Sequence, residues 1–94
     1  VVSSARFKDD IAPIELDTSK IWDLEPVSFG WKADHLKGRR DFGYIAEAVE
    51  QIIPDVVPLD QEGQPYSVNY DRLIVLLIAE TKKLKERIEQ LEAR

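Results

Sequence analysis

Cysteine is absent from the 94-residue sequence, and histidine occurs once, at His35. Without cysteine the chain has no disulfide bonds and no thiolate chemistry, and a single histidine argues against a zinc site or a histidine-triad site. Glycine is also scarce, and its positions are too scattered to cradle a phosphate: Gly30, Gly38, Gly43 and Gly63. We therefore expect no metal ion and no cofactor.

Long apolar runs are missing as well. No stretch of the sequence approaches the roughly 20 apolar residues that are needed to span a bilayer, and no signal-peptide pattern is present. We therefore expect no membrane partner. The sequence also lacks an initiator methionine, and we expect it to be a segment of a longer polypeptide.

Basic residues are absent between Arg40 and Arg72, whereas acidic residues are frequent in and beside this span. The formal net charge of the chain is −5. Such a surface repels duplex nucleic acid, so we expect no nucleic-acid partner. The short basic cluster of Lys37, Arg39 and Arg40 falls in a predicted loop, where a solvated loop is favoured over a phosphate-binding site.

The composition is sufficient for one small domain. Hydrophobic residues make up 44% of the chain and charged residues 33%. A chain of this length buries only about two thirds of its unfolded surface, so a monomer would be marginally stable and we expect a partner surface. Acidic pairs such as Asp9/Asp10 and Glu47/Glu50 are better explained by a solvated face than by paired catalytic carboxylates.

The apolar patterns predict an α+β fold, in which small strands and short helices precede a long C-terminal helix. Alternation over 2–8 and 27–31 predicts two strands. A short helix is expected from a cap at Asp17 or Thr18 to Pro26. The remaining expectations, in chain order, are a polar loop over 32–41, an extended segment over 42–44, a helix over 45–53 and a hairpin around residues 60–63.

The last quarter of the chain differs in kind. Residues 71–94 contain neither proline nor glycine, and apolar residues recur there at spacings of three and four, which is typical of a coiled coil. The seam has six members, alternately at heptad positions a and d: Ile74, Leu77, Thr81, Leu84, Ile88 and Leu91. We therefore divide the single domain into a core over 1–70 and a coiled-coil helix over 71–94.

Charges beside the seam favour a parallel arrangement. Glu80 would face Lys85 of a neighbouring chain, and Arg87 would face Glu92, so both pairs have opposite charge. The alternative is one amphipathic helix that packs on its own domain. Self-association is favoured, because the heptad period persists to the last residue and few apolar residues follow Ile78. The heptads leave dimer and trimer open, since isoleucine at a with leucine at d ordinarily suits dimers.

The first residues, "VVSSARFKDDI", contain the one remaining candidate for catalysis, a serine and a lysine five residues apart. A serine hydroxyl becomes a nucleophile when a base removes its proton, and lysine is such a base only when neutral. Burial or a cationic neighbour favours the neutral form, and Phe7 and Arg6 are the candidates for these roles. In a regular strand Ser3 and Lys8 would point to opposite faces, so a working pair requires a bend, a bulge or a helical turn near Phe7.

The stretch "SSARFKDDI" resembles the Ser-Asp-x-Arg-x-Lys-x-x-Ile signature of the endosialidase-type intramolecular chaperone domain, the self-cleaving C-terminal module of phage tail spikes and fibres. The likeness continues in the same order through "LEPVSFGWK", "GYIAEAVEQIIPDVV", "DQEG", "VNYDRLIVLLIAETKKL" and the final heptads. It therefore covers nearly the whole chain.

This resemblance implies a homotrimer that holds three copies of an upstream fibre or tail spike, part of the same polypeptide, together while they fold. It also implies release by autoproteolysis, with Ser3 as the nucleophile and Lys8 as the general base of a serine–lysine dyad. Arg6 and Ser4 would support the dyad. We expect Ser3 and Lys8 to become aligned only in the assembled trimer. The parent would be a virion tail-fibre or spike precursor made in the host cytoplasm, or a bacterial surface fibre.

Two departures from the signature support a second interpretation. Ser4 stands where the family has aspartate, and Val1 and Val2 still precede Ser3. The alternative function is therefore a non-cleaving trimerisation cap or tip module of a fibre or adhesin. A third possibility, an unrelated α+β domain with a dimeric coiled coil, requires the ordered likeness to be accidental.

Overall fold

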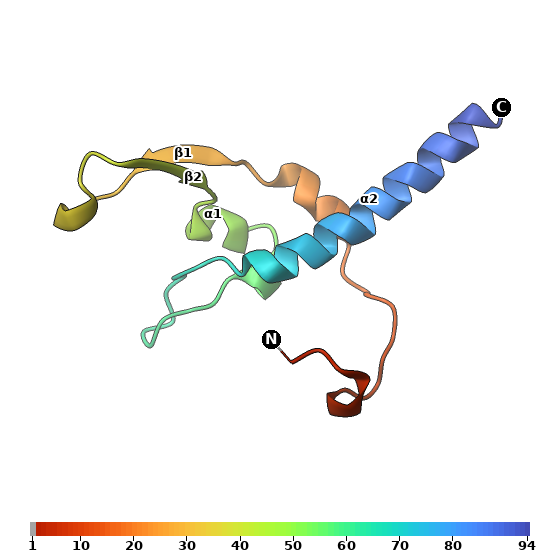
Figure 1. The fold of residues 1–94 in the computed structure, drawn as a ribbon, viewed down its shortest axis with the longest axis horizontal. Coiled ribbons are helices and arrows are strands. Elements are labelled where there is room, and N and C mark those ends of the chain that lie inside the picture. Colours follow the sequence, from red (N-terminus) through yellow and green to blue (C-terminus); the bar gives the residue numbers. More distant parts are fainter. Residues whose placement is uncertain (1) are drawn as a thin grey trace.

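The computed structural model describes residues 2–94 and has the expected α+β fold (Figure 1). It contains a two-stranded sheet, two α-helices and several short 3-10 helices, which are labelled η. In chain order the elements are η1 (Ala5–Phe7), η2 (Thr18–Asp23), β1 (Val27–Gly30), η3 (Asp34–Leu36), β2 (Arg40–Gly43), α1 (Ala46–Glu50), η4 (Pro54–Val56) and α2 (Tyr70–Glu92).

The strand predicted over 2–8 is wrong, because the chain forms the 3-10 turn η1 there. The side chain of Ser4 caps this turn, and the backbone N–H of Lys8 donates to the carbonyl of Ala5 at 3.1 Å. A strand requires a neighbouring strand to pair with its N–H and C=O groups. Within residues 2–94 the sheet contains only β1 and β2, so a local turn satisfies these groups instead.

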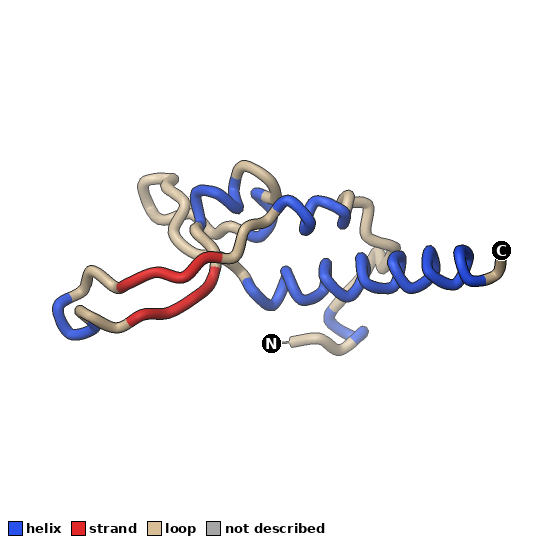
Figure 2. Tube along the Cα trace, turned by 90° about the horizontal axis from the view of Figure 1, so that it is seen from above, coloured by secondary structure: helices blue, strands red, loops and turns tan. Residues whose placement is uncertain are grey.

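The two strands form a hairpin that projects from the body of the molecule (Figures 1 and 2). They pair antiparallel, with Val27 opposite Gly43 and Gly30 opposite Arg40. The strand predicted over 27–31 is therefore confirmed to within one residue. The polar loop predicted over 32–41 is too long, because β2 begins inside it and η3 forms at the hairpin tip.

Helix η2 begins where the sequence predicts, with Asp17 as its cap. The carboxylate of Asp17 accepts hydrogen bonds from the hydroxyl and the backbone N–H of Ser19, at 2.6 and 3.0 Å. These bonds stabilise the charged carboxylate and hold the pKa of Asp17 below its ordinary value. Leu24 follows the helix and enters the core.

The middle of the chain is less regular than its pattern predicts. Helix α1 is shorter than the helix expected over 45–53, because it ends at Glu50 and residues 51–53 lead through a turn to η4 at Pro54. The hairpin expected around residues 60–63 is present as a turn with a single antiparallel bridge, between Leu59 and Pro65. The polar turn is held by the Asp60 carboxylate, which accepts from the backbone N–H groups of Glu62 and Gln64.

The core lies where α1, η4 and the first turns of α2 meet. Ile53 and Val49 are almost inaccessible to solvent, and α2 contributes two leucines from its inner face. Within residues 2–94 the buried apolar set is Leu24, Val49, Ile53, Val56, Val57, Val68, Leu73 and Leu76. Beyond Glu80 the helix has no buried residue, and this half of α2 extends away from the body (Figures 1 and 2).

A buried carboxylate fixes η2 against α2. Glu80 is 8% exposed and accepts hydrogen bonds from the Thr18 hydroxyl at 2.8 Å and from the Trp22 indole N–H at 2.9 Å. Lys83 donates to the Thr18 hydroxyl at 3.0 Å. Both Glu80 oxygens therefore accept hydrogen bonds within one chain, and the pairing of Glu80 with a neighbour's Lys85 stays a prediction. The tertiary fold places this heptad g position inside the domain, which the periodicity does not reveal.

The molecule is extended for its length. The radius of gyration is 17.1 Å, whereas a compact domain of this length has a value of roughly 12 Å. Many large apolar side chains remain exposed, among them Phe42, Ile11 and Tyr66. A hairpin and a half-free helix that project from so small a core indicate that the single chain leaves surfaces to be covered.

The Glu80 network predicts a specific loss of stability. In the variant Glu80→Gln an N–H₂ group replaces one acceptor oxygen, so the buried Thr18 hydroxyl or the exposed Trp22 indole N–H loses its partner. Leaving a buried donor unpaired costs about 1–3 kcal/mol, and an exposed donor costs less because water replaces the partner. Urea unfolding at a fixed protein concentration should show this decrease, while Glu86→Gln, the same change at an exposed position of α2, should have little effect. Equal stabilities of the two variants would contradict the assigned role of Glu80.

Candidate functional site

The predicted serine–lysine pair lies in contact at the front of the chain. The ammonium nitrogen of Lys8 donates a hydrogen bond to Ser3 Oγ at 3.1 Å. Because the pair lies within one chain, the expectation that the two side chains align only in a trimer is wrong. The 3-10 turn η1 is the bend that the spacing requires, since it reverses the chain between residues 3 and 8.

Local hydrogen bonds alone build this turn. Ser4 Oγ accepts from the backbone N–H of Arg6 at 3.4 Å, and the backbone N–H of Phe7 donates to the Ser4 carbonyl at 3.1 Å. Serine and aspartate are equally good caps, because each places an oxygen where it can accept from the first free N–H groups. The serine that departs from the signature therefore still caps the turn in this chain.

Arg6 lies over the ring of Phe7, with its guanidinium carbon 4.3 Å from the ring centroid. A cation over an aromatic face is attracted by the negative charge of the ring. This contact lies within the turn that separates Ser3 from Lys8. The sequence suggested Arg6 and Phe7 as the neighbours that act on Lys8. In the structure these two side chains contact each other.

The dyad is exposed to solvent in the single chain. Residues 2–15 are all exposed and form the N-terminal arm, which lies apart from the core (Figure 1). Its apolar side chains point into solvent as well, with Phe7 60% and Ile11 76% exposed. The hydrogen bond between Ser3 and Lys8 is thus present, while no side chain within residues 2–94 buries the pair.

The C-terminal helix has two faces. The inner face carries Leu73, Leu76 and Glu80, which pack on the chain's own core. The six predicted seam residues lie on another face, and all are exposed. The Thr81 hydroxyl donates to the Leu77 carbonyl at 2.6 Å, so its polar group is satisfied within the helix. The amphipathic-helix alternative accounts for the inner face only and leaves the seam uncovered.

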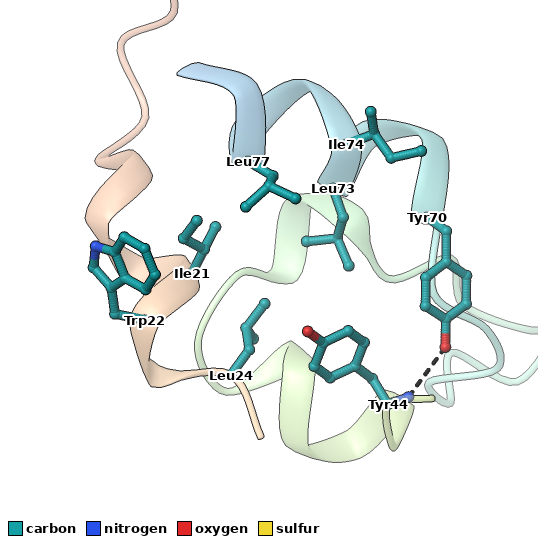
Figure 3. A pocket seen from close by; sticks show the side chains of 8 residues that line it. All are labelled: Ile21, Trp22, Leu24, Tyr44, Tyr70, Leu73, Ile74 and Leu77. Atoms are coloured by element: carbon teal, nitrogen blue, oxygen red, sulfur yellow. Dashed lines mark hydrogen bonds between the residues drawn. The ribbon is translucent and has the colours of Figure 1, made fainter. Parts of the chain in front are cut away.

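An apolar groove lies beside the start of the seam. Figure 3 shows side chains from the η2 segment and from α2 that surround a cavity of about 450 Å³. The Tyr70 hydroxyl accepts a hydrogen bond from the backbone N–H of Tyr44 at 3.1 Å, which closes one end. The groove is lined by Ile21, Trp22, Leu24, Tyr44, Tyr70, Leu73, Ile74 and Leu77. Sequence reasoning missed it, although Ile21 and Leu24 stand at helical spacing.

Gly43 lies close to the Tyr70 side chain beside this groove. A Cβ atom at this position would lie 2.8 Å from the Tyr70 hydroxyl oxygen, so the tyrosine would have to shift. The small residue therefore lets the tyrosine reach the backbone of Tyr44 and join the hairpin base to α2. This explains the Phe-Gly-Tyr stretch in physical terms.

Comparison with known families identifies the chain. Residues 3–58, more than half of the sequence, match the family described as chaperone of endosialidase. The chain belongs to this family. The match includes Ser3 and Lys8 and ends before α2, which begins at Tyr70. The search of curated proteins found no match for the chain.

Membership of the chaperone of endosialidase family supports a chaperone role, and the family is named among peptidases. Other classes of site find no support in the part of the chain that the structure describes. Residues 2–94 contain no cluster of three or more histidine or acidic side chains arranged to bind a metal ion. No helix among these residues is both long enough and apolar enough to cross a membrane.

Proposed function

We propose that this chain is an intramolecular chaperone that forms a homotrimer through α2, assists the folding of an upstream trimeric β-structured fibre or tail spike, and then releases itself by cleavage at Ser3. The family supports the chaperone role. The observation that carries the peptidase role is the 3.1 Å contact between Lys8 Nζ and Ser3 Oγ. In this role the chain is part of a tail-fibre or spike precursor or of a bacterial surface fibre.

The proposed chemistry requires the observed hydrogen bond to reverse. Lys8 now donates to Ser3, whereas a general base must be a neutral amine that accepts the Ser3 proton. Ser3 Oγ then attacks the carbonyl carbon of the peptide bond that adjoins it. The C–N bond breaks, the leaving nitrogen takes the proton from Lys8, and water hydrolyses the resulting ester. Two chain ends result, and the dyad is used once.

In this proposal, assembly covers the N-terminal arm, which is exposed in the single chain. The two groups are already in contact, but the N-terminal arm is exposed and its apolar side chains are uncovered. A neutral amine is favoured when the group is withdrawn from water. We infer that packing against neighbouring copies covers the arm, so that cleavage follows trimer formation.

A trimerising helix helps a fibre for kinetic reasons. Three chains of a β-structured fibre must find one common register through contacts that are distant in sequence, which is slow and prone to aggregation. A local helix that trimerises early raises the effective concentration of the three client segments. Cleavage then removes the chaperone from the equilibrium and leaves the fibre stabilised by its slow unfolding.

The second candidate is a cap that trimerises without cleaving. The exposure of Ser3 and Lys8 favours it, since nothing within residues 2–94 buries the pair. Both candidates require assembly through the seam of α2, and they differ only in what happens at the N-terminal arm.

Cleavage distinguishes the two candidates. When the segment is expressed behind its native upstream sequence, we expect two fragments on a denaturing gel for the wild type and one full-length band for Ser3→Ala and for Lys8→Ala. Lys82→Ala, at an exposed position of α2, should cleave like the wild type. Full-length protein in every case would contradict self-cleavage and support the non-cleaving cap.

Ser4 should affect the rate of cleavage, because it caps the turn between Ser3 and Lys8. Loss of a cap costs about 1 kcal/mol, which corresponds to roughly fivefold in rate if the turn must form before cleavage. Ser4→Ala should therefore slow cleavage by about this factor, and Ser4→Asp should restore it because aspartate caps equally well. The rates are measured by densitometry after synthesis is stopped. A slow Ser4→Asp variant would show that the hydroxyl has some other role.

Assembly through the seam is tested by placing a charge in it. Burial of a leucine contributes about 1.5–3 kcal/mol, and three copies of a buried glutamate would also repel one another. In sedimentation experiments Leu84→Glu should therefore shift the wild-type trimer toward monomers. Gln90→Glu adds the same charge outside the seam and should remain trimeric. A wild type that sediments as a monomer at high concentration would refute the proposed function.

A further inference from the structure

The apolar groove opens directly onto the coiled-coil seam. Ile74 and Leu77 belong to both, so the groove and the seam form one continuous apolar surface. Its far wall is η2, which the buried Glu80 network holds in place through Thr18 and Trp22. A partner that packs on the seam therefore also reaches the groove.

Heptad positions show which side of the seam the groove occupies. With Ile74 at a and Leu77 at d, Leu73 and Glu80 fall at g; Leu73 lines the groove, and Glu80 bonds to η2. The groove thus lies on the g side of the helix. In a parallel coiled coil, a residue at g faces the residue five positions later, at e, in the neighbouring chain. Leu73 of one chain accordingly faces Ile78 of the next.

Ile78 is unusual for an e position, which in coiled coils commonly carries charge. It is an apolar side chain, 57% exposed, and it lies outside both the inner face and the six-residue seam. The next e residue is Lys85, which forms an ion pair with Glu89 on its own helix at 3.8 Å. The apolar e residue thus occurs only in the heptad that lies opposite the groove.

We propose that Ile78 of one copy inserts into the groove between α2 and η2 of the neighbouring copy. The inference rests on the proposed trimer and specifies its interface: each chain gives one isoleucine and receives another. It also sets the register. A slip by one heptad would place Lys85 or Asp71 against the apolar groove, and the burial of an unpaired charge there is costly. The contact thereby aligns the three chains in the only register that keeps the groove apolar.

Cross-linking tests the contact directly, because the natural chain has no cysteine. Two forms of the chain, distinguished by C-terminal tags of different size, are co-expressed and each carries one cysteine. Ile78→Cys paired with Ile21→Cys, a groove position, should give a disulfide-linked species of mixed size under mild oxidation. Val75→Cys, equally exposed on α2 but at position b, should give none with Ile21→Cys.

The outcomes separate this inference from the proposed function. A trimer in sedimentation with the Ile78–Ile21 cross-link supports it. A trimer without that cross-link overturns the inference and leaves assembly through the seam intact. A cross-link of Ile21→Cys to Ile11→Cys instead would show that the N-terminal arm fills the groove, which also overturns it. Single chains at all concentrations would refute the proposed function itself.

Discussion

The carboxylate of Glu80 is the group on which the arrangement of the other parts depends. It sits on α2 and accepts from Thr18 and Trp22 of η2, so it joins the first third of the chain to the last. Within one chain this decides which face of α2 is inside. The seam then faces solvent, and η2 becomes the wall of a groove beside it. A buried carboxylate tolerates this position because both of its oxygens are hydrogen-bonded, which offsets the cost of removing its charge from water.

The contact between Ser3 and Lys8 has a different, local origin. Ser3 and Lys8 are brought together by a turn that depends only on its own backbone and on the Ser4 cap. No core residue supports the turn, and the arm stands apart from the body (Figure 1). The contact geometry is thus local, whereas no part of residues 2–94 protects the pair from water.

Several features could be predicted from the sequence because they depend on neighbours along the chain. The Asp17 cap, the strand at Val27 and the long helix to Glu92 follow from capping, alternation and heptad patterns. The strand expected over residues 2–8 failed for an instructive reason. An alternating pattern forms a strand only when a partner strand is available to pair with its backbone. The pattern does not show whether such a partner strand exists. The burial of Glu80 was likewise not predictable from the heptads, since its partners Thr18 and Trp22 are distant in sequence.

By itself, then, the sequence determined the spacing of Ser3 and Lys8, the heptads of α2 and membership of the chaperone of endosialidase family. These are short-range properties, set by the order of residues and by the periods of regular structure. The tertiary structure alone decided that the serine and lysine meet in a 3-10 turn, that Glu80 lies inside, and that an apolar groove opens beside the seam. The last two depend on which distant segments pack together, and a pattern along one chain does not contain that information. The first depends on a local turn, which the alternating pattern did not distinguish from a strand.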